Sequence, residues 1–392
     1  MKKIIFIFSI FFFISPCFAI NEDVILLPKD EIEREKELLD GEKEVILEEK
    51  INPYSKKALK GIIEKDYDLN SAEGMFSEQL KAEFKRGIIK NAGVQLDVIQ
   101  TFDKTLDADN RFDSKYNLQT LQLGLKGKFR SEVDGYNFLF ELSPNIHDNF
   151  MQRLVADAWI ETKRLKNHTI MFGTSRTPVG YEGGQSAYLI PFLSRSQIAR
   201  TIGNSRKTGV RIKGNYKYAN YDIGGYSSDT FYTEFLPGAG TDIWVNFKPL
   251  ANLKDKYGNL NIGGGVQIGE RNSHDFFTTT TALKYDYKKF WLLAEYANSD
   301  GSNGGSGITK RKAQGYNITL AYRLTKKLEF LLRFDDFDVD KKKSNNKTKE
   351  YTAGLNYFVL GQTARLMLNY VFCQNDGKSD SHRLILGSQF LL

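Results

Sequence analysis

The chain has 392 residues, with 55 Lys and Arg against 48 Asp and Glu, a formal net charge of +7 and a mean hydropathy of −0.42. After residue 20 no apolar run approaches the roughly 18 residues that a membrane-spanning helix needs, which excludes a helical membrane protein. With 2 Cys in the whole chain, a disulfide scaffold and a cysteine-based metal site are excluded as well.

The amino terminus has the pattern of an export signal. Lys2 and Lys3 precede the apolar run Ile4–Ile14, and Ala19 offers a small residue for cleavage. A basic start, a short apolar stretch and a small residue are typical of a signal peptide rather than of a membrane span. We therefore predict a signal peptide over residues 1–19 and a mature protein that works outside the cytoplasm.

Residues 20–90 form a charged segment with 18 acidic and 13 basic side chains. Ile32, Leu39 and Ile46 are spaced seven residues apart, which is the spacing of a weak coiled-coil stripe. Two interpretations stay open: a coiled coil that helps the protein to oligomerise, or a flexible periplasmic tail surrounded by water. A second helix is predicted over Ala72–Ile89.

From residue 91 to residue 392 the sequence alternates between apolar and polar positions. Near residue 330, for example, Phe330 falls on one parity, whereas Glu329 and Arg333 fall on the other. A period of two is the signature of an extended strand that lies between two different environments. Sixteen such strands can be placed in this region, and the last one ends at Leu392.

One parity of these strands carries no charge in our assignment. Its members include Val94, Leu96, Val98, Leu121, Leu123, Leu125, Tyr136, Phe138, Phe140, Leu154, Ala156, Ala158, Tyr316, Ile318, Leu320, Tyr322, Leu366, Leu368 and Tyr370. The other parity carries charged residues such as Asp157, Lys284 and Arg333. Since a Lys or Arg that faces lipid at mid-bilayer costs about 2–4 kcal/mol, this division assigns one face to lipid and the other to water.

The pattern predicts an all-β fold: a 16-stranded antiparallel transmembrane β-barrel in the outer membrane of a Gram-negative-type cell. The connections support it, because short ones such as Arg164–Asn167 alternate with long ones such as Ser299–Lys312. Outer-membrane barrels have short periplasmic turns and long outer loops, whereas a soluble β-sandwich has no reason for this alternation. Lys248–Tyr257 is long for a periplasmic turn and is an exception.

The longest connection, Thr174–Lys207, is the third outer loop and the candidate functional site. Its basic residues are Arg176, Arg195, Arg200, Arg206 and Lys207, against the single acid Glu182. A connection of this length is usually functional. Folded into the barrel, it would narrow the pore and line it with guanidinium groups, whose planar donors suit phosphate and carboxylate.

Further basic residues extend this prediction along the lumen. Lys126, Lys128, Arg211 and Lys213 fall on the water-facing parity and form a predicted basic track. Residues 91–392 hold 40 basic and 30 acidic side chains, and a basic lumen favours anions. The alternative for each loop arginine is a solvated charge that binds lipopolysaccharide phosphates.

The sequence gives no pattern for catalysis or for a cofactor. The four His residues lie at 147, 168, 274 and 382, without the spacing of a metal or catalytic motif. The acidic run Asp335–Asp340 lacks the glycine of a calcium loop, so a solvated strand end is favoured over a cation site. We predict no catalytic residues, no metal and no cofactor.

The central part of the chain resembles a known family, the phosphate-selective porin O and P family. The residues that carry the resemblance are Asp157-Ala158, Gly173 to Arg176, Pro178, Gly180, Glu182, Phe192-Leu193-Ser194-Arg195-Ser196, Arg206, Gly209-Val210 and Gly214. The resemblance is sharpest over Asp157–Gly214 and extends as architecture over residues 91–392. It does not cover residues 20–90 with any clarity.

This resemblance implies a sixteen-stranded homotrimer that conducts anions through a basic constriction, with Arg195 and Arg206 at the positions of the family's loop arginines. Two departures concern selectivity: Ser194 stands where an acid usually precedes the arginine, and Arg176 stands where Lys is common. Family membership is therefore better supported by the sequence than selectivity for phosphate.

The sequence as a whole favours a porin that lets small anions, with phosphate as the leading candidate, diffuse through the outer membrane. The expected partners are these anions, the lipid bilayer with its lipopolysaccharide, and two further copies of the chain, and not a nucleic acid. A general porin with mild anion preference is the nearest alternative. An outer-membrane enzyme and an adhesin are less favoured alternatives, because no catalytic cluster accompanies the strands.

Overall fold

A computed structural model of the chain describes residues 81–106, 112–143, 154–230, 234, 236–305, 307–377 and 379–391. All described residues belong to one compact unit, which lies within residues 51–392. The signal peptide and the coiled-coil stripe predicted above lie outside the described residues.

Sixteen antiparallel strands form the wall of a barrel in the described part of the chain. They are β2 (Ile89–Leu106), β3 (Phe112–Phe129), β4 (Asp134–Glu141), β5 (Val155–Thr162), β6 (His168–Arg176), β7 (Arg206–Asn215), β8 (Ala219–Ser227), β9 (Ala239–Phe247), β10 (Asn259–Arg271), β11 (His274–Tyr287), β12 (Phe290–Asp300), β15 (Gln314–Arg323), β16 (Leu328–Asp338), β17 (Lys347–Leu360), β18 (Ala364–Asn375) and β19 (Ser381–Leu391). Each strand pairs with the next one along the chain, so the order in the sheet is the order in the sequence.

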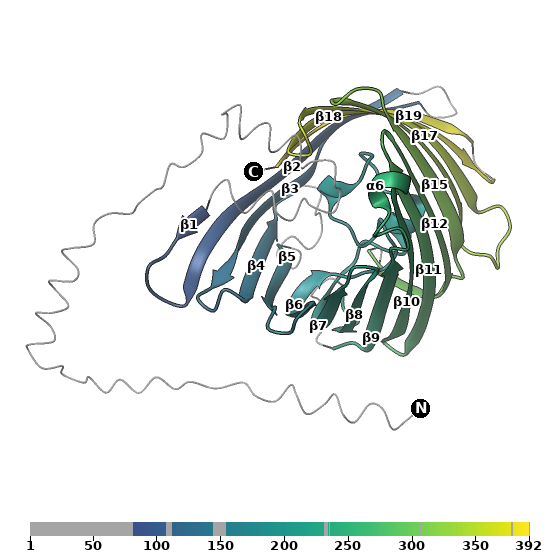
Figure 1. Ribbon diagram of the computed structural model, residues 1–392. Helices are drawn as coiled ribbons and strands as arrows, with labels where there is room; N and C mark the ends of the chain where they lie inside the picture. The colour runs from purple at the N-terminus through teal and green to yellow at the C-terminus, as the bar shows by residue number, and fades with distance from the viewer. Residues whose placement is uncertain are drawn as a thin grey trace, which may run out of the picture. The chain divides into compact units, whose positions relative to one another are not determined.

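The barrel closes where its last strand meets its first. β19 pairs antiparallel with β2, from His382 opposite Leu106 to Leu391 opposite Asp97 (Figure 1). The outermost backbone groups of the sheet thereby find partners, and the wall has no free edge strand. The predicted 16-stranded antiparallel barrel is confirmed.

The two faces of the wall differ as the alternation predicts. On β16, Phe330 and Leu332 point outward and are 41% and 45% exposed, whereas Arg333 on the inner face is 3% exposed. Large exposed apolar side chains recur at alternate positions around the barrel, and buried polar ones occupy the positions between them. An apolar outer surface and a polar interior are what a barrel needs to stand in a membrane and enclose water.

β-Bulges shift this alternation in places that the sequence did not reveal. The pairing of β4 with β5 skips one residue, so that Leu139 lies opposite Asp157 and Phe140 opposite Val155. Ala156, which we had assigned to the outer face, is the extra residue and is only 3% exposed. An added residue reverses the parity of the strand beyond it, and this assignment was therefore wrong.

The connections alternate in length with two exceptions. The expected one follows β9, where residues 248–258 include the short helix α6 (Lys254–Tyr257). The second was not predicted: β10 and β11 are joined on the long-loop end by only Asn272 and Ser273. Both residues have positive φ, 50° and 63°, as a tight two-residue hairpin requires.

The segment just before the barrel also differs from the prediction. Instead of a helix through residue 89, Lys81–Glu83 form the strand β1, which pairs with residues 91–93 of β2. The helix predicted over Ala72–Ile89 is therefore wrong for residues 81–89, the part of it that the structure describes. In the described residues, no helix combines the length and the apolar character needed to cross a membrane.

The outward position of Leu386 on β19, 52% exposed, gives a direct test of the membrane-facing surface. Leu386→Arg should lower the free energy of unfolding from lipid vesicles by about 2–4 kcal/mol, because the charge would face hydrocarbon. Leu165, 57% exposed in the short connection between β5 and β6, is the matched control. Leu165→Arg should leave the unfolding free energy within about 0.5 kcal/mol of wild type. Equal effects at the two sites would contradict the assignment of this face to lipid.

Candidate functional site

The connection between β6 and β7, residues 177–205, is the longest one in the described part of the chain. We call it the inner loop. It contains the 3₁₀ turn η2 (Ala187–Leu189) and the short helix α5 (Gln197–Thr201). The helix begins at Ser196, whose hydroxyl accepts a hydrogen bond from the backbone N–H of Ala199 at 3.3 Å.

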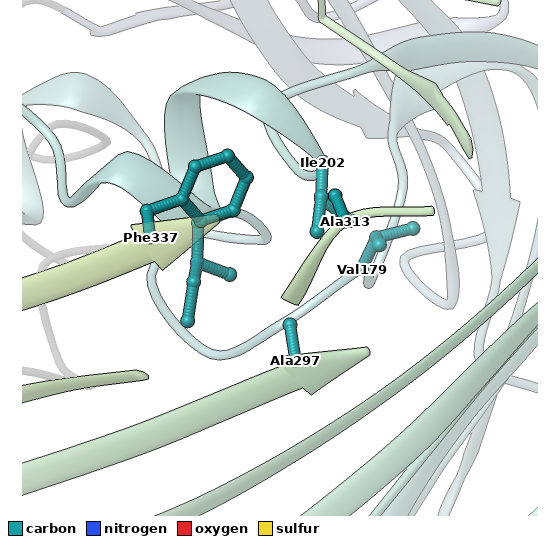
Figure 2. Packing of buried hydrophobic residues seen from close by; sticks show 6 residues of the cluster. Val179, Ile202, Ala297, Ala313 and Phe337 are labelled. Atoms are coloured by element: carbon teal, nitrogen blue, oxygen red, sulfur yellow. The ribbon is translucent and has the colours of Figure 1, made fainter. Parts of the chain in front are cut away.

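Apolar contacts hold the inner loop against the inside of the wall. Ile198 and Ile202 pack with Val179, Ala297 and Phe337 in one buried cluster (Figure 2). Farther along the wall, Leu193 joins a cluster with residues of β2, β18 and β19, and Phe192 joins another with residues of β12, β15 and β16. The inner face is thus not uniformly polar, because apolar patches on it match the apolar residues of the loop.

Two glycines of the wall make room for this contact. A Cβ atom at Gly354 would lie 2.8 Å from the Phe192 ring, and one at Gly387 would lie 2.5 Å from the Leu193 side chain. Neither distance is compatible with ordinary van der Waals contact. Small residues at these two positions are therefore a condition for the seating of the loop.

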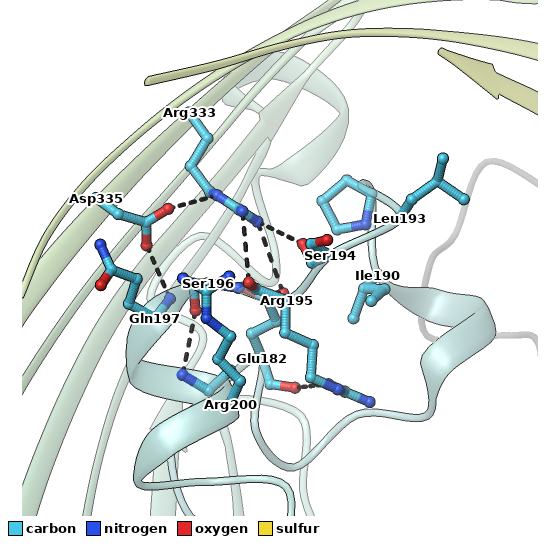
Figure 3. A network of polar contacts seen from close by, with 12 residues as sticks. Glu182, Ile190, Leu193, Ser194, Arg195, Ser196, Gln197, Arg200, Arg333 and Asp335 are labelled. Carbon is cyan, nitrogen blue, oxygen red and sulfur yellow. Dashed lines mark hydrogen bonds and ion pairs between the residues drawn. The ribbon is translucent and has the colours of Figure 1, made fainter. Parts of the chain in front are cut away.

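Arg333 of β16 fixes the middle of the inner loop with its guanidinium group (Figure 3). Its two terminal nitrogens donate to the backbone oxygens of Ser194 at 3.0 Å and Arg195 at 3.4 Å. Its Nε lies 2.7 Å from Asp335, and that carboxylate accepts the backbone N–H of Gln197 at 3.1 Å. One buried ion pair thus satisfies three backbone groups of the loop, which would be costly to leave without partners.

Side-chain amides and a second arginine continue this support on neighbouring strands. Asn356 donates to the oxygen of Pro191 at 2.9 Å, and Asn369 accepts the N–H of Leu193 at 2.8 Å. Arg365 donates to the oxygen of Ile190 at 2.7 Å. The irregular backbone of the loop is in this way hydrogen-bonded inside the barrel, as a non-regular segment at this depth must be.

The connection between β12 and β15 contacts the inner loop near the C-terminal end of that loop. The hairpin of β13 (Ser302–Gly304) and β14 (Gly307–Thr309) donates the N–H of Gly305 to the oxygen of Gly203 at 2.8 Å. Asn303 is fully buried, and its amide donates to the oxygen of Ser228 at 2.8 Å. Gln267 of β10 accepts the backbone N–H of Asn303 at 3.1 Å. The inner loop, the hairpin and the connection after β8 therefore form one hydrogen-bonded assembly.

The predicted constriction residues lie in or beside the inner loop, in two kinds of environment. Arg195 donates to the backbone oxygens of Glu182 at 2.6 Å and Gln185 at 2.7 Å, and Arg176 donates to the side-chain oxygen of Asn204. These acceptors are neutral, but the carboxylates of Glu182 and Glu295 still act on the charge of Arg195 at longer range. Burial lowers the pKa of Arg195 to about 10, so its guanidinium stays charged at neutral pH.

The other three predicted constriction residues form ion pairs. The pairs are Arg200 with Glu350 at 2.6 Å, Arg206 with Asp157 at 2.8 Å, and Lys207 with Asp242 at 3.0 Å. Lys207 is only 1% exposed and lies on β7 between the rings of Tyr226 and Phe276. A carboxylate contact reduces what each cation can offer to a passing ion, and Lys207 offers it little surface.

The predicted basic track is divided between two parts of the wall. Lys126 and Lys128 project from the short-turn end of β3, and Arg211 and Lys213 lie on β7, beyond β4, β5 and β6. Arg211 is buried and forms an ion pair with Asp222. Lys126 and Lys213 are half-buried and Lys128 is exposed, so all three have surface accessible to solvent, and their role in a lumen track stays a prediction.

Sequence analysis missed the anchors of the inner loop and the hairpin on top of it. Arg333 was assigned to the inner face, but nothing in a single sequence indicated that it holds backbone oxygens 139 residues away. For the hairpin, the run Gly301 to Gly305 inside a long connection was an available signal for tight backbone contact. In the described residues, no three His, Cys, Asp or Glu side chains gather as metal ligands would.

A closed barrel with an apolar outer surface, a polar interior and a connection packed inside it is the architecture of an outer-membrane pore. The described structure therefore defines the class of protein as a porin-type channel of the outer membrane.

The comparisons with known proteins place the chain within that class. The family model described as phosphate-selective porin O and P matches residues 91–241 and 260–390, and the chain belongs to this family. It is an outer-membrane porin of the Gram-negative envelope. No curated protein matches the chain.

Solved structures share the fold at low sequence identity. An anion-selective porin from Comamonas acidovorans matches with a TM-score of 0.58 and 13% identity, over 77% of this chain and 99% of its own. The outer membrane channel DcaP of Acinetobacter baumannii matches with a TM-score of 0.56 and 11% identity, over 81% and 99%. OmpT of Vibrio cholerae, in its trimer form, matches with a TM-score of 0.56 and 10% identity, over 77% and 99%. These matches are evidence of a shared fold alone.

A valine at Gly354 should release the tip of the inner loop, because its side chain would overlap the Phe192 ring. The barrel should still assemble, and single-channel conductance in planar bilayers should rise by about half or more as the lumen widens. Gly225→Val is the matched control, since a Cβ there meets nothing within 4 Å. Unchanged conductance of a folded Gly354→Val channel would show that this contact does not seat the loop.

Asn303→Ala should loosen the hairpin, because it leaves the buried oxygen of Ser228 without its donor. The expected loss of local stability is about 1–3 kcal/mol. Hydrogen–deuterium exchange should become faster in residues 301–305 and at Gly203. Asn298→Ala, on the outer face of β12, should leave exchange in the hairpin as it is in the wild type. Protection that survives in Asn303→Ala would count against the assembly of loop and hairpin.

Proposed function

We propose that this porin conducts small anions by passive diffusion past the inner loop, and that phosphate is among them. The proposal is based on the groups that accept hydrogen bonds from three arginines in and beside the inner loop. Arg195 and Arg365 donate to backbone oxygens, and Arg176 donates to a side-chain amide. Neutral acceptors orient a guanidinium without pairing its charge directly, so we expect a positive potential beside the loop that Glu182 and Glu295 reduce in part.

The paired cations make a smaller contribution to this potential. Arg200, Arg206 and Arg211 each contact a carboxylate, so each pair is nearly neutral at a distance. Such pairs hold the wall and the loop in place and attract an ion only at short range. Anion preference therefore depends on a few cations, not on the total number of basic residues.

Lys126, Lys128 and Lys213 extend the proposed pathway toward the short-turn end. A flexible ammonium group attracts an anion as a point charge and releases it easily. Conduction needs contacts that are strong enough to admit the ion and weak enough to let it leave. Arginines at the constriction followed by lysines in a wider region meet both requirements.

The relatives support this proposal in two respects. The Comamonas acidovorans neighbour is an anion-selective porin, and the family is described as phosphate-selective. For assembly, OmpT of Vibrio cholerae is a neighbour with a trimer form, and we propose a homotrimer for this chain as well. Lipopolysaccharide around the barrel belongs to the same proposal, since the exposed rim would stand in that leaflet.

A general porin with mild anion preference is the second candidate. Four carboxylates, Glu182, Glu295, Asp335 and Glu350, lie at or beside the inner loop and limit the positive potential there. Phosphate added to a chloride solution separates the candidates. A phosphate-preferring pore should show block of the chloride current at millimolar phosphate, whereas a general porin should not.

Charge removal at two of the three arginines with neutral acceptors, Arg176 and Arg195, tests the anion pathway. The double variant Arg176→Gln, Arg195→Gln should lower the chloride-to-potassium permeability ratio about fivefold. Each unit charge at roughly 8 Å in water with salt shifts the energies of chloride and potassium by about 0.25 kcal/mol in opposite directions. Reversal potentials across planar bilayers under a salt gradient measure this ratio. Gln can still donate one hydrogen bond, which helps the loop to keep its backbone path.

Arg164→Gln is the matched control for this experiment. Arg164 is exposed in the short connection between β5 and β6 and pairs with Asp134 at 2.7 Å, away from the inner loop. Its removal should leave the reversal potential at the wild-type value. If the double variant also keeps the wild-type reversal potential, the two arginines play no part in selecting anions.

A further inference from the structure

The two ends of the barrel differ in charge. The eight connections at the short-turn end that the structure describes, from residues 84–88 to residues 361–363, hold 14 basic and 2 acidic residues. The connections at the long-loop end hold 11 basic and 9 acidic residues. Since the short turns of outer-membrane barrels face the periplasm, the rim on that side is the strongly basic one.

Three neighbouring connections of this rim form one continuous surface. They are residues 216–218 between β7 and β8, residues 248–258 between β9 and β10, and residues 288–289 between β11 and β12. The backbone N–H of Lys248 donates to the oxygen of Tyr218 at 2.7 Å, and the side chain of Asn252 donates to the Tyr218 hydroxyl. The hydroxyl of Tyr285 on β11 donates to the oxygen of Tyr257 at 2.6 Å. The connection that is long for a periplasmic turn is thus hydrogen-bonded on both sides.

Five exposed lysines lie on this surface, which we call the lysine–aromatic patch. They are Lys217, Lys254, Lys256, Lys288 and Lys289. Asp255 is the one acidic residue in the three connections. Within the described residues, none of the five lysines has a carboxylate at ion-pair distance. Their charges are therefore available to an anionic partner.

Aromatic and apolar side chains are interspersed with these lysines. Tyr218, Leu253 and Tyr257 are 49%, 49% and 46% exposed. Three ammonium nitrogens lie near tyrosine rings: that of Lys217 at 5.6 Å from the centre of Tyr218, that of Lys256 at 5.0 Å from Tyr257, and that of Lys288 at 4.8 Å from Tyr287. A ring with a cation beside it is suited to the boundary between hydrocarbon and lipid headgroups.

The lysine–aromatic patch borders the apolar outer face of the wall. Phe247 and Phe290 lie exposed at the short-turn ends of β9 and β12, directly beside the connections of the patch. Aromatic residues on the outer face of a barrel mark the level of the headgroups. The lysines follow these aromatic residues in the connections, which places their charges at the level of the phosphates of the periplasmic leaflet.

We propose that the lysine–aromatic patch binds anionic phospholipids of the periplasmic leaflet through their headgroups. The lysines would contact the phosphate groups, and Tyr218, Leu253 and Tyr257 would lie beside the glycerol and the upper acyl chains. Several lysines on one patch attract an anionic lipid more strongly than a zwitterionic one. An acidic polymer of the periplasm would use the lysines alone and gain little from the exposed rings. The inference goes beyond the proposed function, because none of the five lysines belongs to the proposed anion pathway.

Phosphatidylglycerol and phosphatidylcholine with identical acyl chains are the probes, since they differ only in the headgroup and its net charge. Native mass spectrometry of the purified protein in detergent counts the lipids that stay bound as each one is titrated. Half-saturation of the wild type should need about tenfold less phosphatidylglycerol than phosphatidylcholine. The triple variant Lys217→Gln, Lys256→Gln, Lys288→Gln should reduce this preference to about twofold.

The triple variant Lys341→Gln, Lys342→Gln, Lys343→Gln is the matched control. These three lysines are exposed in the connection between β16 and β17 at the long-loop end, so the control loses the same net charge away from the patch. Its preference for phosphatidylglycerol should stay at the wild-type value. A preference that falls equally in both triple variants would overturn the proposal, because net charge alone would then explain the effect.

The double variant Leu253→Ser, Tyr257→Ser tests the apolar part of the patch. It should weaken the binding of both lipids about threefold and leave the ratio between them as it is. Polyglutamate is the probe for an acidic polymer. If polyglutamate binds the wild type but not the patch triple variant, and the double variant binds both lipids as the wild type does, the lipid assignment is wrong. Equal binding of the two lipids by the wild type would also overturn it.

Discussion

The structure depends on the rule that a backbone inside a membrane must satisfy its own hydrogen bonds. A sheet with free edges would leave a row of N–H and C=O groups in hydrocarbon, where each costs several kcal/mol. The pairing of β19 with β2 removes both edges. Closure then fixes the rest: one parity of every strand must be apolar, the other can be polar, and connections that enter the interior must bring their own hydrogen-bond partners or find them on the wall.

A few wall residues supply hydrogen-bond partners for the backbone of the inner loop. Arg333 satisfies two backbone oxygens, Asp335 satisfies a backbone N–H, and Asn356 and Asn369 satisfy two more groups. The clusters around Phe192 and Leu193 exclude water from the same contact. The buried charges of Arg333 and Asp335 therefore serve to position the loop.

The barrel was predictable from the sequence because alternation is a local property. A strand shows its two faces within five or six residues, and the outward position of Phe330 and the inward position of Arg333 follow from that alone. The bulge at Ala156 was not predictable, since one added residue depends on the partner strand. The two-residue turn at Asn272 and the hairpin at Asn303 were not predicted from the sequence for a similar reason. At the site, the predicted basic residues gather around the inner loop, but pairs such as Lys207 with Asp242 join strands that are distant in sequence.

The two glycines under the loop tip limit how this pore can be altered. Gly354 and Gly387 belong to β17 and β19, far along the chain from the Phe192 and Leu193 side chains that they admit. If residues 177–205 were transferred to a related barrel, the loop could pack against the wall only if that barrel has small residues at both positions. The loop and these two wall positions therefore have to change together. A loop exchanged between related porins would need the glycines at 354 and 387 as well.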